Sequence, residues 1–295
     1  MTALDQPIPT LGVFDSGFGG LTVLRALVTR LPHAQFAFLG DTARLPYGSK
    51  SRRTIARYAA ESAQFLVRDQ GAQFLVIACN TASALALDAI QDAVPVPVLG
   101  VIQPGAAAAR AASQTGDVLV IATDATVQSH AYAAACHALG LRALEKACPL
   151  LVPLVEEGWT NHPVTSEIIR IYLDELLSQA KSTNMNPDVL VLGCTHYPLL
   201  RTLIERAVPA GTRVIDSAEA VAAAAARLLG ENAGVKTDAG CPILSTSLVE
   251  RVGENPAHQT DIRCFATDSV DKFERLGSRF LGHPVGKVQL VDLGG

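Results

Sequence analysis

Two short apolar segments that end in a cysteine constrain this chain most strongly. Residues 75–82 read LVIACNTA, and residues 189–200 read VLVLGCTHYPLL. A continuous apolar run of this length, bounded by small or polar residues, is typical of a strand buried on both faces of a parallel sheet. Residues after such a strand lie at the carboxyl edge of the sheet, where open α/β folds bind ligands. The sequence therefore predicts the same kind of site twice, with Cys79 in one copy and Cys194 in the other.

Apolar runs and amphipathic helical stretches alternate along the rest of the chain, which favours an α/β fold with mostly parallel sheets. Residues 11–14 form an apolar run that leads into Asp15, Ser16 and a glycine-rich turn, and residues 35–39 lead into the loop at 40–48. The glycine-rich turn does not match a dinucleotide fingerprint. With 295 residues, about two domains are expected. We place the first domain boundary at residues 103–105.

Composition excludes several classes of protein. The 24 basic and 28 acidic residues are interspersed, which argues against nucleic-acid binding. No apolar stretch approaches the roughly 18 uninterrupted residues of a membrane span. Residues 1–10 lack the basic and apolar regions of a secretory signal, so we expect a cytoplasmic protein.

Six cysteines are present, and none of them belongs to a CxxC pair. This spacing disfavours a zinc ribbon or a thioredoxin-type site, and we expect no metal. In a reducing compartment most of these cysteines are expected to be free thiols. Four of them are interpreted as core filling, structural or incidental: Cys136, Cys148, Cys241 and Cys264.

Thiols at two equivalent strand ends suit proton transfer on opposite faces of one bound molecule. If the two halves face each other across a cleft, one thiolate can remove a proton while the other thiol donates one. A free cysteine has a pKa near 8.5, so both forms are within reach near neutral pH. Asp15 and His196 are positioned to assist the thiols. Three polar residues beside the thiols are candidates to anchor a substrate by hydrogen bonds: Asn80, Thr81 and Thr195.

Several features allow more than one interpretation. Asp41 suits a turn cap, whereas Tyr47 and Gly48 fit a packed aromatic or a ligand contact equally well. Asp216 is better explained as a helix cap than as a catalytic group. Residues 152–159, VPLVEEGW, have the character of a loop over a site. The two thiols could also form a disulfide, which requires Cα atoms within about 7 Å of each other.

Five blocks together resemble glutamate racemase, the cofactor-independent enzyme family that interconverts L- and D-glutamate. The blocks occur in the family's order, and the match runs from about residue 11 to residue 217: GVFDSGFGGLTVL, LGDTARLPYGSKS, IACNTASA, VPLVEEGW and VLGCTHYPLL. The resemblance implies two pseudosymmetric three-layer α/β domains with the active site between them. Because the C-terminal part would return to complete the first domain, the expected domains are residues 1–103 with 215–295, and residues 104–214.

The resemblance also implies roles for particular residues. Cys79 and Cys194 would be the catalytic proton donors and acceptors, supported by Asp15 and His196. Eight residues would hold the glutamate: Asp15, Ser16, Tyr47, Gly48, Asn80, Thr81, Thr195 and His196. In the family, the thiol matching Cys79 takes the proton from D-glutamate and that matching Cys194 takes it from L-glutamate.

The resemblance further implies a biological setting. It suggests no cofactor, a homodimer, a peptidoglycan-precursor activator in some members, and a supply of D-glutamate for peptidoglycan. Three alternatives stay open: a racemase for aspartate or another amino acid, a non-catalytic binding protein such as a gyrase inhibitor, and a thiol redox protein.

Overall fold

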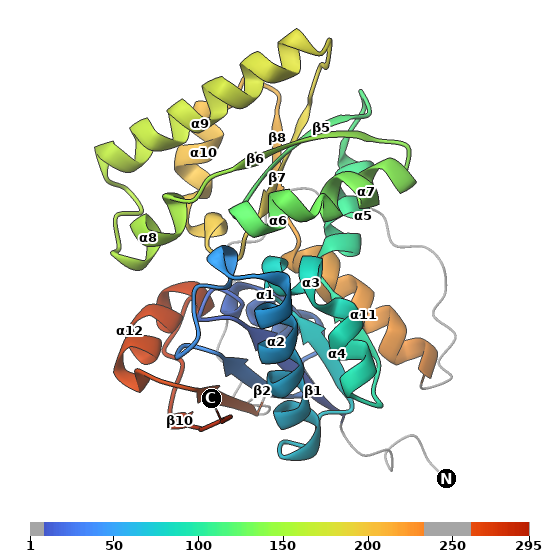
Figure 1. Ribbon diagram of the computed structural model, residues 1–295, viewed down its shortest axis with the longest axis vertical. Helices are drawn as coiled ribbons and strands as arrows, with labels where there is room; N and C mark the ends of the chain where they lie inside the picture. Colours follow the sequence, from blue (N-terminus) through green and yellow to red (C-terminus); the bar gives the residue numbers. More distant parts are fainter. Residues whose placement is uncertain (1–8, 233–260, 295) are drawn as a thin grey trace.

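Two parallel sheets organise the structure, a computed structural model that describes residues 9–232 and 261–294 (Figure 1). The first sheet has the order β10-β9-β2-β1-β3-β4 and the second the order β6-β5-β7-β8. The first is built from β1 (Thr10–Asp15), β2 (Gln35–Gly40), β3 (Phe74–Ile77), β4 (Val98–Gly100), β9 (Ile262–Ala266) and β10 (Val288–Leu290). The second is built from β5 (Asp117–Ala122), β6 (Arg142–Ala147), β7 (Val189–Gly193) and β8 (Arg213–Asp216).

The two cysteine-bearing segments follow interior strands of the sheets. β3 lies between β1 and β4, and β7 lies between β5 and β8. All residues of β3 and β7 are buried, as expected for interior strands whose two faces are both covered by helices. The predicted α/β fold with parallel sheets is therefore confirmed.

Helices cover both faces of the first sheet. One face packs against α2 (Arg52–Arg68), α3 (Asn80–Leu85) and α4 (Leu87–Ala93). The other face packs against α1 (Leu21–Arg30), α11 (Ala218–Asn232) and α12 (Val270–Leu281). β1 shows the alternation directly, because Val13 belongs to the second of these cores and Phe14 to the first. Figure 1 shows these helices around the sheet that forms the first lobe of the molecule.

The second sheet is covered in the same way. α5 (Ile102–Ala112) and α7 (Ala131–Ala138) pack on one face. α9 (Pro163–Ser182) and α10 (Arg201–Ala207) pack on the other. Three shorter elements belong to the connections of the second sheet: α6 (Asp124–Ser129), α8 (Leu151–Glu156) and the 3₁₀ turn at Tyr197–Leu200. A further 3₁₀ turn, Tyr47–Ser49, lies between β2 and α2 in the first lobe. Each sheet is thus the middle layer of three.

The chain visits the first lobe twice. After β8 closes the second sheet, α11 packs against α1, and β9 pairs with β2 in the first sheet (Figure 1). The return of the C-terminal part that the resemblance implied is present. The exact domain limits stay a proposal; sheet membership would move the second boundary from residue 214 to the end of β8, because the predicted limit falls inside that strand.

Two segments are helical where the sequence indicated a boundary or a loop. Residues 103–105, where we place the first domain boundary, lie in the first turn of α5. The segment 152–159 is largely α8, although four of its residues do line the cavity described below: Val152, Pro153, Glu156 and Glu157. Across the two described ranges, no helix combines the length and the apolar character needed to span a membrane. Cys241 lies outside the described residues.

Candidate active site

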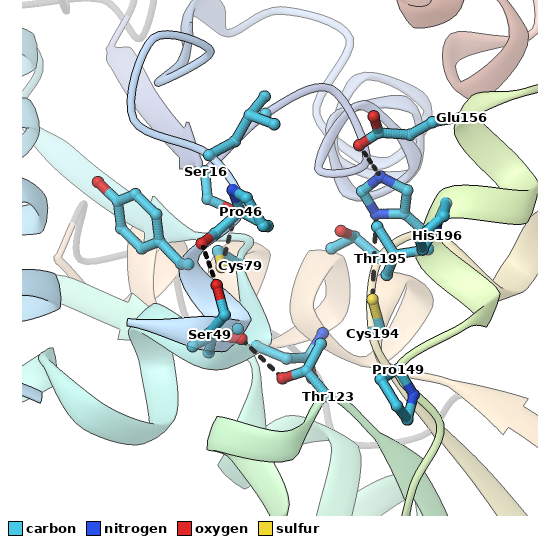
Figure 2. Close-up of a pocket in the computed structure, with 18 of the residues that line it drawn as sticks. Ser16, Pro46, Ser49, Cys79, Thr123, Pro149, Glu156, Cys194, Thr195 and His196 are labelled. Atoms are coloured by element: carbon cyan, nitrogen blue, oxygen red, sulfur yellow. Dashed lines mark hydrogen bonds and ion pairs between the residues drawn. The ribbon is translucent and has the colours of Figure 1, made fainter. Parts of the chain in front are cut away.

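A cavity of about 310 Å³ lies where the carboxyl ends of the two sheets meet. Nine of the ten predicted site residues line it: Ser16, Tyr47, Gly48, Cys79, Asn80, Thr81, Cys194, Thr195 and His196. The exception is Asp15, which is buried behind the cavity wall. The two sulfur atoms lie apart in Figure 2, with Cys79 beside Ser16 and Cys194 below the ring of His196. The cavity therefore has one thiol from each lobe.

Cys79 is held as a thiol at the start of α3. Its side chain is only 5% exposed, and its thiol donates to Oγ of Ser16 at 3.3 Å. The backbone N–H of Ala82 donates to the sulfur at 3.4 Å, because Cys79 caps the helix. Burial, reinforced by the negative charge of Asp15, raises the pKa of Cys79 to about 12. The raised pKa favours the thiol form of Cys79 at neutral pH.

Cys194 is paired with a basic group. Its Sγ lies 3.9 Å from Nδ1 of His196, and Nε2 of the same ring lies 3.4 Å from a carboxylate oxygen of Glu156 (Figure 2). Burial opposes the charged form of the ring, but the contacts with Cys194 and Glu156 outweigh it and raise the pKa of His196 to about 10. A protonated imidazole is thereby placed between the sulfur of Cys194 and the carboxylate of Glu156.

Asp15 stands behind the glycine-rich turn. One carboxylate oxygen accepts the N–H of Gly17 at 2.9 Å, and the other lies 3.5 Å from Oγ of Thr195. Burial raises the pKa of Asp15, and the nearby His196 only partly opposes this effect. Asp15 is therefore placed to act on both thiols through their neighbours rather than through the cavity surface.

Asp41 fixes the loop that carries Tyr47. The phenol of Tyr47 donates to Oδ2 of Asp41 at 2.5 Å, while Oδ1 accepts the hydroxyl of Thr267 at 2.9 Å. Arg44 also donates to this carboxylate. Asp41 thus does more than cap a turn. Tyr47 is both a packed aromatic, 1% exposed, and a residue of the cavity wall.

Hydroxyl and amide groups join the lobes at the cavity. The hydroxyls of Thr81, Thr123 and Thr126 lie 2.9–3.3 Å from one another, and Thr81 belongs to the first lobe while the other two belong to the second. Tyr132 donates to Oδ1 of Asn80 at 2.7 Å. These contacts hold the side chains of Asn80 and Thr81 in fixed positions at the cavity wall.

Tyr132→Phe is expected to raise KM for the substrate severalfold and to lower the free energy of unfolding by about 1–2 kcal/mol, because a buried amide oxygen loses its partner. Steady-state kinetics and urea unfolding measure the two effects. Tyr172→Phe, which removes a hydroxyl from a tyrosine that does not line the cavity, serves as the control. An unchanged KM in Tyr132→Phe would contradict a positioning role for this hydroxyl.

Two glycines allow close contact beside the cavity. A Cβ at Gly19 would lie 2.3 Å from Oγ1 of Thr195 and 2.7 Å from Nδ1 of His196. A Cβ at Gly48 would lie 3.0 Å from Cβ of Thr123. Both contacts join the first lobe to the second. At Gly19, the glycine-rich turn therefore allows the two lobes to pack closely.

Sequence reasoning missed three residues near the thiols. Thr123 and Glu156 line the cavity, and Lys272 of α12 lies 3.2 Å from Glu156. The acidic pair at 156–157, in an otherwise apolar stretch, was the available signal for Glu156. Lys272 comes from a region in which the sequence indicated no chemistry. Within the described residues, no group of three or more His, Cys, Asp or Glu side chains is arranged to hold a metal ion.

Comparison with known protein families identifies the family of this chain. The family model described as Asp/Glu/Hydantoin racemase matches residues 15–225. The chain belongs to the Asp/Glu/Hydantoin racemase family. Within this family, the glutamate racemase of Koribacter versatilis is 53% identical over 290 residues, which is 97% of this chain and 98% of that protein. The sequence-based resemblance is thereby confirmed.

Solved structures of racemases in this family share the fold. Glutamate racemase from Bacillus anthracis aligns with a TM-score of 0.81 at 34% identity, and that from Francisella tularensis, in complex with D-glutamate, with 0.80 at 33%. Both alignments cover 97% of this chain and 98% of the other. The Escherichia coli enzyme, in complex with L-glutamate and the activator UDP-MurNAc-ala, aligns with 0.71 at 26% over 98% of this chain and 100% of the other.

Proposed function

We propose that this racemase interconverts L- and D-glutamate by moving the α-proton between Cys79 and Cys194. The observation that carries the proposal is the pair of free, buried thiols, one from each lobe, at a single cavity. The names of the relatives support glutamate as the substrate. In the reaction, one thiolate accepts the α-proton and becomes a thiol, and the opposite thiol donates its proton to the other face of the carbanion and becomes a thiolate.

The surroundings of the two sulfurs differ, which assigns a resting state. Cys79 keeps its proton, whereas Cys194 lies against the protonated ring of His196. This arrangement suits removal of the proton of L-glutamate by Cys194 and donation by Cys79. Reaction of D-glutamate begins from the opposite protonation state, in which Cys79 is the base. Which sulfur acts on which enantiomer is proposed from the family resemblance.

The remaining predicted residues are proposed to hold the substrate. Ser16 and Gly48 lie on the first-lobe side of the cavity, and Thr195 lies on the second-lobe side. Hydroxyl, amide and backbone groups of this kind can accept hydrogen bonds from the α-ammonium group and donate hydrogen bonds to the two carboxylates. Asp15, which does not line the cavity, is proposed to support the thiols and the bound ammonium electrostatically. The full set is Asp15, Ser16, Tyr47, Gly48, Asn80, Thr81, Thr195 and His196.

The biological setting is proposed from the family resemblance. D-glutamate from this reaction would supply peptidoglycan synthesis in the cytoplasm, and the protein would act as a homodimer. The activator in the Escherichia coli complex supports testing a peptidoglycan precursor as a regulator of this chain. No cofactor is included in the proposed mechanism.

Circular dichroism of purified protein with L- or D-glutamate, with no cofactor added, tests the proposed function. The expected result is decay of the signal to zero from either enantiomer, because the two enantiomers have equal free energy. Turnover of aspartate but not of glutamate would show that aspartate, and not glutamate, is the substrate. Absence of turnover with all amino acids would favour a binding protein. Loss of two thiols on mild oxidation would favour a redox protein.

A further inference from the structure

A lysine from α12 contacts Glu156, the carboxylate that lies against His196 in the second lobe. Nζ of Lys272, on α12, lies 3.2 Å from Oε2 of Glu156, on α8. The lysine side chain is 41% exposed, whereas that of Glu156 is 16% exposed. Nζ also lies 5.5 Å from the centre of the Phe18 ring, within the range of a cation–π contact. The ion pair therefore joins the two lobes at the edge of the cavity.

The contacts continue from this ion pair to the sulfur of Cys194. Glu156 uses Oε2 for Lys272 and Oε1 for Nε2 of His196, at 3.4 Å. The other ring nitrogen, Nδ1, faces Sγ of Cys194 at 3.9 Å. The four side chains thus form a line in which positive and negative groups alternate, from the surface to the reacting sulfur. The two oxygens belong to one rigid carboxylate group. A contact that holds Oε2 in place therefore also holds Oε1 in place against His196.

α12 is itself held firmly beside the site. The ring of Phe280 contacts His196 edge-on at a centroid distance of 5.2 Å, and Phe273 packs against Phe18 at 6.0 Å. One helical face thus supplies an apolar support for the imidazole and, through Lys272, a cation for its carboxylate partner. Near Arg279, seven residues further along the same helix, a side chain at Gly158 would meet the guanidinium. α12 therefore approaches the region of α8 at two points.

We propose that Lys272 is a positioning residue that holds Glu156 against His196 and thereby keeps the imidazole oriented toward Cys194. Lys272 does not line the cavity, so it acts through the other residues and not on the substrate. The proposal rests on the proposed racemase function, and it assigns a role in the reaction to the C-terminal part of the chain.

The expected effect is on turnover and not on substrate binding. Lys272→Met is expected to lower kcat about fivefold, the size of effect of a partly exposed ion pair, with KM changed less than about twofold. Lys272→Arg keeps the charge and should restore most of the activity. Arg275→Met removes the same charge from an exposed position on the same helix and should behave as the wild type.

The titration of His196 distinguishes positioning from a simple charge effect. The charged groups that face this ring are Cys194, Glu156 and Asp15, with Lys272 beyond Glu156. Removing a nearby cation would, through the loss of Coulomb repulsion alone, raise the pKa of the ring. Loosening Glu156 removes a partner of the imidazolium and lowers it. Positioning by Lys272 therefore predicts a lower pKa of His196 in Lys272→Met.

The experiment combines kinetics with an NMR titration of the His196 ring, assigned with His196→Asn, in wild type, Lys272→Met, Lys272→Arg and Arg275→Met. The expected result is a lower kcat and a lower His196 pKa in Lys272→Met only. An unchanged or raised pKa, or equal loss of activity in Arg275→Met, would overturn the proposal. An inactive wild type would instead contradict the proposed function, and the NMR titration would still report on the contact.

Discussion

Cys79→Ser and Cys194→Ser are each expected to lower racemisation of glutamate by about 10³-fold or more, within the range for loss of a general acid or base. A hydroxyl holds its proton much more tightly than a thiol, so neither variant can complete the transfer across the substrate. The measurement is the initial rate by circular dichroism from each enantiomer, with far-ultraviolet spectra to verify folding.

Cys136→Ser is the matched control for these variants. Cys136 is buried in α7, and burial raises its pKa to about 11. Because it does not line the cavity, its replacement should leave racemisation largely intact. Equal activity in all three variants would refute the two-thiol mechanism.

The two catalytic variants should also differ in heavy water. Cys79→Ser keeps the sulfur assigned to L-glutamate, and Cys194→Ser keeps the one assigned to D-glutamate. Each variant should therefore exchange the α-proton of one enantiomer faster than that of the other, as measured by NMR. The same preference in both variants would contradict the assignment of one sulfur to each face.

His196→Asn is expected to lower kcat about 10²-fold, because Cys194 loses the cation that lies beside its sulfur and can stabilise negative charge formed there during proton transfer. The neutral amide keeps a polar group near the sulfur and Glu156 but carries no charge. Steady-state rates measure the loss, and His137→Asn, at an exposed position on α7, is the control. A rate close to that of wild type would show that the imidazolium does not support Cys194.

The same substitution is expected to change how stability depends on pH. The pKa of His196 is raised to about 10 in the folded protein, against about 6.5 in an unfolded chain. Its contribution is therefore fully present below pH 6.5 and is lost as the pH rises toward 10. Cys79, with its pKa raised to about 12, adds a similar loss at higher pH in both proteins. Urea unfolding of wild type and His196→Asn should thus converge between pH 6.5 and 10.

The sequence was informative where the signal is local. The runs before Cys79 and Cys194 are short, apolar and bounded by polar residues, so the strands and the sheet edge that they reach followed from pattern alone. The pairing of the two sites across one cavity followed from their similarity. Nine side chains named in advance line that cavity because they directly follow strands or lie in the loop before α2.

Prolines explain both errors in secondary structure. Pro104 and Pro153 each stand third in a helix, α5 and α8 respectively. In the first turn of a helix, the missing N–H would have had no intrahelical partner, so proline is tolerated there. Interpreting each proline as a boundary or a loop therefore removed the start of a helix from the prediction.

Contacts between distant parts of the chain were beyond sequence reasoning. The contacts among three side chains depend on how the lobes pack: Glu156, His196 and Lys272. They form because α8 and the end of β7, in the second lobe, lie against α12 of the first lobe. Sequence periodicity does not predict contacts between such distant residues, since each of them also suits an exposed helix or loop. Thr123 is similar, because its place near Thr81 depends on how the lobes approach each other.

The glycines at the seam between the lobes have a consequence for what the enzyme can accept. At Gly19 and Gly48 the backbone of the first lobe lies directly against short side chains of the second, so the spacing of the lobes at these points leaves little room for a side chain. Even one methyl group added at either glycine would push the lobes apart and lengthen the path of the proton between the sulfur and the substrate. Selectivity for substrate size can therefore be set at positions that carry no chemistry of their own.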